Sequence, residues 1–117
     1  MKVIDKYDVR TAEAIVAFGD ASDPRLLEWV QDLNWPVASV LAPFLSNSGI
    51  IVAPGIRQVL ASNDESWKWS VLSSVVAGSP DLISLLRAEL EGIARAPSLG
   101  ERTEGLDELV AELLRTI

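Results

Sequence analysis

The chain has 117 residues and contains neither histidine nor cysteine. It therefore lacks Ser-His triads, thiol nucleophiles, disulfides, Fe-S clusters and most zinc and iron sites, so we expect no metal, no cofactor and no enzymatic activity. Its 17 acidic residues outnumber the 10 basic ones, and this net charge of -7 opposes binding to nucleic acid or membrane and favours a basic protein partner.

The hydrophobic fraction of 49% is typical of a globular chain, and the length predicts one domain over residues 1–117. The first ten residues, MKVIDKYDVR, are polar, and no apolar run follows them. We therefore expect no signal peptide, no membrane span and a cytoplasmic location. The first helix is predicted over residues 9–18, with Ala12, Ile15 and Phe18 facing inward.

Apolar residues at helical spacing predict further helices along the chain. Their apolar residues span 26–33, 37–45, 52–60, 71–76, 82–93 and 106–117. Residues 96–105, APSLGERTEG, form the longest predicted loop. No run alternates between apolar and polar residues, so the chain is predicted to be all-α.

The breaks between these segments carry helix start and stop signals. Asp23-Pro24 and Ser79-Pro80 each place an oxygen-bearing cap before a proline, which suits the first turn of a helix. Asp64 is the predicted cap of the helix that carries Trp67. Gly49 and Gly78 follow apolar helical faces, where a left-handed residue often ends a helix.

A weak internal repeat relates two of the helices. Residues 34–41 align with residues 68–75 at an offset of 34, a period found in α-solenoids. The sequence therefore predicts a short α-α superhelix of about six to seven helices.

Four segments resemble an uncharacterised family of short bacterial proteins. They are DKYD (5–8), LLEWVQDLNWPVA (26–38), VAPGIRQVL (52–60) and DESWKW (64–69). The chain departs from the family pattern at residues 69–70, which are Trp-Ser in place of Tyr-Trp. The resemblance implies a HEAT-like helical fold, and the family has the size and layout of bacterial immunity proteins, which bind and neutralise a toxin.

All four tryptophans lie between residues 29 and 69. Trp29 and Trp35 fall on apolar helical faces and are predicted to pack between helices. Trp67 and Trp69 point about 200° apart on one helix, so one of them is expected to be exposed, where tryptophan favours partner binding.

Acidic residues flank these aromatic side chains. Helix capping and solvation explain them without a partner, and a solvated helix face explains the acids of the C-terminal third, Glu101 and Glu104 among them. The functional alternative is an acidic, tryptophan-bearing face that docks a basic protein. Its candidate residues are Glu28, Asp32, Trp35, Asp64, Glu65, Trp67 and Trp69.

The leading expectation is therefore a protein-binding domain, an immunity protein that neutralises a toxin acting in the cytoplasm. The alternative is a scaffold or adaptor module unrelated to toxins. A third class, an enzyme using carboxylates alone, would draw on Asp32 and Asp64. The oligomeric state is left open by the sequence.

Overall fold

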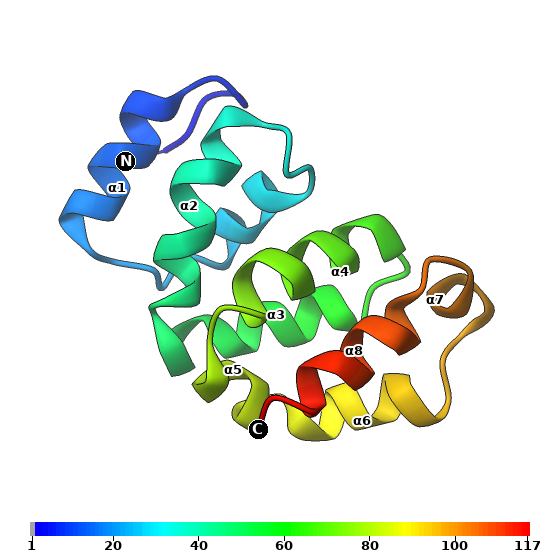
Figure 1. Cartoon of the computed structure of the whole chain (residues 1–117). Helices are drawn as coiled ribbons and strands as arrows, with labels where there is room; N and C mark the ends of the chain where they lie inside the picture. Colours follow the sequence, from blue (N-terminus) through cyan, green and yellow to red (C-terminus); the bar gives the residue numbers. More distant parts are fainter. Residues whose placement is uncertain (1) are drawn as a thin grey trace.

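The computed structural model describes residues 2–117, and every regular element in that range is helical (Figure 1). The α-helices are α1 (Val9–Phe18), α2 (Pro36–Ser46), α3 (Ala53–Leu60), α4 (Glu65–Val71), α5 (Pro80–Leu85), α6 (Arg87–Arg95), α7 (Leu99–Thr103) and α8 (Leu106–Leu114). Two 3-10 segments, η1 (Pro24–Val30) and η2 (Gly49–Val52), and a π-helical segment, η3 (Leu72–Val76), complete the set. The predicted all-α class is confirmed, with more and shorter helices than expected.

The helices form an elongated body with extents of 40 × 25 × 19 Å. Helices α1 and α2 pack together at one end, and α6 and α8 pack together at the other (Figure 1). Helix α4 and its continuation η3 lie between these pairs and contact η1, α2, α3 and α8. In the described part of the chain, no helix is long and apolar enough to cross a membrane.

Side-chain caps start several helices where the sequence places them. The carboxylates of Asp23 and Asp64 accept from the backbone amides of Arg25 and Trp67, and Ser79 Oγ accepts from Leu82 N. Capping therefore fixes where η1, α4 and α5 begin.

The two predicted glycine stops behave differently. Gly49 has a φ of 63°, which confirms the left-handed residue expected after α2. Gly78 does not have a positive φ. It is instead a site of close approach, because a Cβ atom there would lie 2.8 Å from Ser46 Oγ.

Several sequence predictions near helix ends were wrong. Phe18 is 73% exposed, although Ala12 and Ile15 are buried, because α1 ends at Phe18 and the chain turns away at Gly19. The segment around residues 26–33 is a 3-10 helix rather than an α-helix, and Leu33 beyond it is exposed.

The C-terminal half holds two further differences. The predicted helix over 82–93 is divided at Leu86 into α5 and α6, yet the four residues that define its apolar spacing are buried: Leu82, Leu86, Leu90 and Ile93. The predicted loop 96–105 contains α7, which starts with a capping box: Ser98 Oγ accepts from Glu101 N, and the Glu101 carboxylate accepts from Ser98 N.

Candidate functional site

Helix α4 holds the elements on both of its sides by side-chain hydrogen bonds. Trp67 Nε1 donates to Leu27 O at 2.9 Å, and Ser70 Oγ donates to Gln31 O at 3.0 Å. Leu27 is the middle residue of η1, and Gln31 is the residue that caps its C-terminal end. These bonds fix η1 against α4.

On its other side, α4 is tied to α7 by a buried ion pair. Lys68 Nζ lies 3.0 Å from Glu101 Oε2, and the two side chains are only 5% and 11% exposed. Burial alone would raise the pKa of Glu101, but the hydrogen bond from Ser98 N and the Lys68 ammonium outweigh it and lower the pKa. The expectation that Glu101 is solvated was therefore wrong.

The space between these three elements is a groove. Its two halves share Gln31 from the end of η1, Ser66 from α4 and Glu104 from the α7–α8 turn. The remaining lining residues are Asp32, Leu33, Asn34, Trp69 and Ser70 in one half and Ser62, Asn63, Asp64, Glu65 and Trp67 in the other. Below, the acidic groove means this set of residues.

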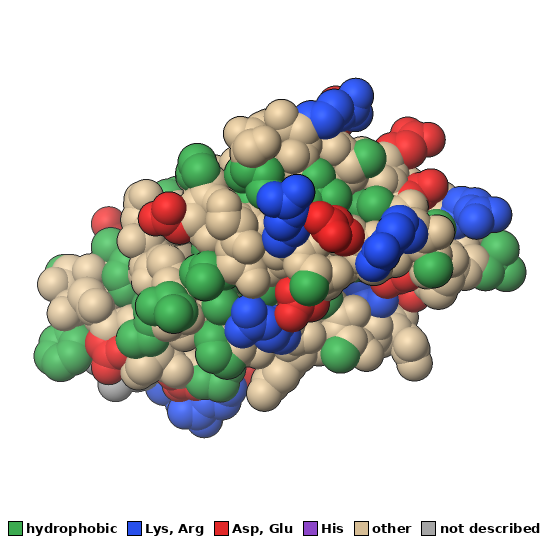
Figure 2. Space-filling model, turned by 90° about the horizontal axis from the view of Figure 1, so that it is seen from below, with side chains coloured by type: hydrophobic (Ala, Val, Ile, Leu, Met, Phe, Trp, Pro, Cys, Tyr) green, Lys and Arg blue, Asp and Glu red, His purple; other side chains and the backbone are tan. Residues whose placement is uncertain are grey.

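Four carboxylates line the acidic groove, from Asp32, Asp64, Glu65 and Glu104, and its described lining contains no lysine or arginine. The face shown in Figure 2 differs, since basic, acidic and apolar side chains are interspersed there. The ion pairs found among residues 2–117 involve none of these four carboxylates. The groove therefore presents uncompensated negative charge.

Two of these carboxylates also have a local structural role. Asp32 Oδ1 accepts from Asn34 N at 2.9 Å, and Asp64 Oδ1 accepts from Trp67 N at 3.0 Å. Each bond uses one carboxylate oxygen, so the other remains available to a partner. No group of three or more acidic side chains within residues 2–117 is arranged to hold a metal ion.

The two tryptophans of α4 are oriented differently. Trp67 is half-buried and is bonded to η1, whereas Trp69 is 41% exposed. The ring of Trp69 lies beside the α7–α8 turn, since a Cβ on Gly105 would be 3.8 Å from its Cζ3 atom. The prediction that one of this pair is exposed is confirmed, and the exposed residue is Trp69.

Two predicted residues lie outside the acidic groove. Glu28 and Trp35 line a separate hollow together with Trp29, whose ring centroid is 6.1 Å from that of Trp35. Gln31 lines both concavities. Of the seven predicted residues, the structure thus brings together Asp32, Asp64, Glu65, Trp67 and Trp69.

Sequence reasoning missed the contribution of the α7–α8 turn. Glu104 was grouped with a solvated helix face, but the fold places it in the acidic groove. The one available signal was the Glu104-Gly105 dipeptide, because glycine favours a turn. In the structure Gly105 has a φ of 75° and is the N-cap residue of α8. That signal predicts a turn, but it does not predict which distant residues lie beside that turn in the fold.

Together, these features define a small all-helical domain with an acidic groove and one exposed tryptophan. The chain belongs to the family described as Domain of unknown function (DUF5071), whose model matches residues 5–114. No curated protein matches the chain.

Proposed function

We propose that this protein is a non-enzymatic binding domain that binds a basic protein partner through the acidic groove. The observation that carries the proposal is a set of four carboxylates that form no ion pair within residues 2–117, in a lining without a basic side chain. Two of them, Asp32 and Glu104, lie in the half of the groove that contains the exposed Trp69. Such charge steers a positive partner during encounter, and burial of the tryptophan holds the complex.

The finer proposal is that the partner is a bacterial toxin acting in the cytoplasm and that this chain is its immunity protein. The family that the chain resembles has the size and single-domain layout of bacterial immunity proteins, which supports this proposal, as does the net charge of -7. A toxin that binds nucleic acid needs a basic surface, which is the complement of an acidic groove. Binding there would cover the surface the toxin uses on its target.

Co-expression tests the finer proposal directly. The product of the neighbouring gene is expressed alone and together with this chain, and cell growth and complex formation are measured. We expect this chain to restore growth and to co-purify with the toxin. A complex that forms without any toxicity to relieve would favour the adaptor alternative, and the absence of a complex would refute the immunity proposal.

Paired variants test the groove itself. Asp32→Asn with Glu104→Gln removes two charges while keeping oxygens that can accept the local hydrogen bonds. The matched control, Glu108→Gln with Glu112→Gln, removes two charges from exposed positions of α8. We expect the groove variant alone to weaken binding, more at 50 mM than at 500 mM salt, because salt screens the attraction. Equal loss in both variants would assign the effect to net charge and not to the groove.

A further inference from the structure

The hollow beside the acidic groove has an aromatic wall and an apolar floor. The rings of Trp29 and Trp35 meet at 58°, and the buried side chains of Val3, Ile15 and Leu26 line the hollow with them. Its volume of about 440 Å³ falls within the range of protein pockets that bind small organic groups.

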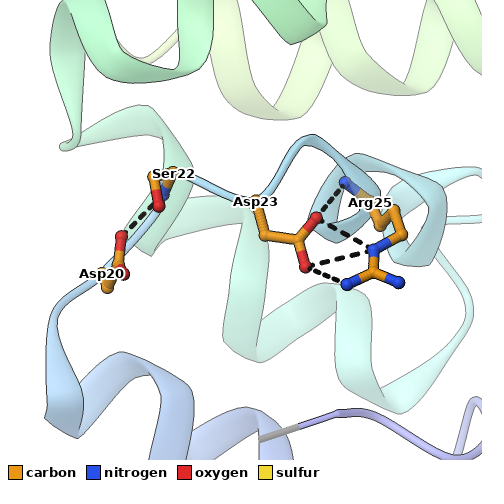
Figure 3. Close-up of polar contacts among 4 residues, drawn as sticks. All are labelled: Asp20, Ser22, Asp23 and Arg25. Atoms are coloured by element: carbon orange, nitrogen blue, oxygen red, sulfur yellow. Dashed lines mark hydrogen bonds and ion pairs between the residues drawn. The ribbon is translucent and has the colours of Figure 1, made fainter.

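The charges around this hollow cancel, in contrast to those of the groove. Its rim has two basic residues, Lys2 and Arg25, and two acidic ones, Asp23 and Glu28. Asp23 and Arg25 neutralise each other through a bidentate contact, with Arg25 Nη2 at 2.9 Å from Asp23 Oδ2 (Figure 3). A charged ligand therefore gains little net attraction here, and a ligand in the hollow would be stabilised mainly by burial of its apolar surface.

We propose that this hollow receives an aromatic side chain of the same partner whose positive charge faces the acidic groove. The inference rests on the proposed function. Trp29 and Trp35 both line the hollow, so an aromatic ring that enters it can pair with an indole ring. Aromatic pairs gain more than their buried area, and a leucine side chain does not make such a pair. Gln31 borders both concavities, so one partner surface spans them.

The experiment uses the whole chain and a neutral probe, N-acetyl-phenylalanine amide, with N-acetyl-leucine amide for comparison. Binding is followed by the NMR signals of the four indole N–H groups. We expect the signals of Trp29 and Trp35 to shift, with the phenylalanine probe bound about 2- to 10-fold more tightly. No shift at these two residues, equal binding of both probes, or shifts centred on Trp69 would overturn the inference.

A variant and its control complete the test. Trp35→Leu is expected to abolish the preference for the phenylalanine probe, whereas Trp69→Leu should leave both titrations unchanged. If Trp35→Leu does not fold, the titrations of the wild type and of Trp69→Leu still show whether the phenylalanine probe binds in the hollow.

The two proposals can fail separately. In the complex with the toxin, Trp35→Leu should weaken binding at 500 mM salt as much as at 50 mM, because apolar burial is not screened. If only the groove variant weakens the complex, the hollow inference is wrong and the proposed function stands. If the probes bind the hollow as expected but the groove variant has no effect, the proposed function is wrong.

Discussion

Among single residues, Lys68 and Glu101 are expected to affect stability strongly, because both partners of this ion pair are almost fully buried. Removing one partner of a buried pair leaves the other as an uncompensated charge in a medium of low dielectric constant. We expect Lys68→Met to lower the free energy of unfolding by about 3–5 kcal/mol, measured by urea denaturation.

The control for this prediction is an exposed ion pair. On α6, Arg87 Nε lies 2.7 Å from Glu91 Oε1, and the two side chains are 66% and 39% exposed. Arg87→Met should cost only about 0.3–0.5 kcal/mol, since exposed helical pairs contribute little. Similar losses in Arg87→Met and Lys68→Met would show that the buried pair has no special role.

The same pair predicts how stability depends on pH. The pKa of Glu101 is lower in the folded protein than the ordinary value of 4.5. The ionised carboxylate therefore adds stability above pH 4.5, and this contribution is lost as the pH falls through the lower, folded pKa.

Comparison with Glu101→Gln isolates this effect. The difference in free energy of unfolding between wild type and variant should be largest at pH 7 and should shrink as the pH falls below 4.5, because protonated Glu101 resembles glutamine. Urea denaturation at several pH values measures it. A difference that stays constant with pH would contradict the ionised pair.

At the scale of elements, η1 and α3 pack closely at Gly55. A Cβ atom there would lie 2.8 Å from Leu27 Cδ1 and 3.3 Å from Pro24 Cβ. Leu27 is buried and Pro24 is a rigid ring, so neither can move easily. We expect Gly55→Ala to destabilise the fold by about 1–3 kcal/mol in thermal or chemical denaturation.

Gly92 provides the matched control within α6. A Cβ atom at Gly92 would meet nothing within 4 Å. Alanine favours helix over glycine by about 1 kcal/mol, so Gly92→Ala should stabilise the protein. Changes of the same sign in the two variants would refute the close contact at Gly55.

Local sequence patterns predicted most helices well, but they did not predict which helices pack against one another. The spacing of apolar residues located the buried faces, and the caps at Asp23, Asp64 and Ser79 are confirmed. The repeat is only partly reflected in the structure: residues 36–41 and 70–75 are helical in both copies, but Trp35 precedes α2 whereas Trp69 lies inside α4. Sequence similarity over eight residues does not fix where a helix begins.

The acidic groove was only partly predictable, since its walls come from distant parts of the chain. Asp64, Trp67 and Trp69 share one segment and were found together, but Glu104 reaches them only through the packing of α7 and α8. The ion pair of Lys68 with Glu101, 33 residues apart, holds α7 against α4 and has no local signature in the sequence.

For the whole molecule, the excess of acidic residues predicts a salt dependence of stability. Repulsion between like charges destabilises a compact state, and salt screens it. We expect the thermal midpoint to rise between 50 and 500 mM NaCl, where about 1 kcal/mol corresponds to roughly 4 °C for a domain of this size. The groove concentrates four carboxylates without a basic side chain, so these carboxylates should contribute more to the repulsion than carboxylates elsewhere on the surface do.

The two double variants used to test binding also measure how much the groove carboxylates contribute to this repulsion. Asp32→Asn with Glu104→Gln should reduce the rise in midpoint more than Glu108→Gln with Glu112→Gln does, and should raise the midpoint itself at low salt. Such a result would mean that the groove carboxylates lower stability, which is expected of residues kept for binding and not for folding. If both variants behave alike, the repulsion is spread over the surface, and stability gives no reason to single out the groove.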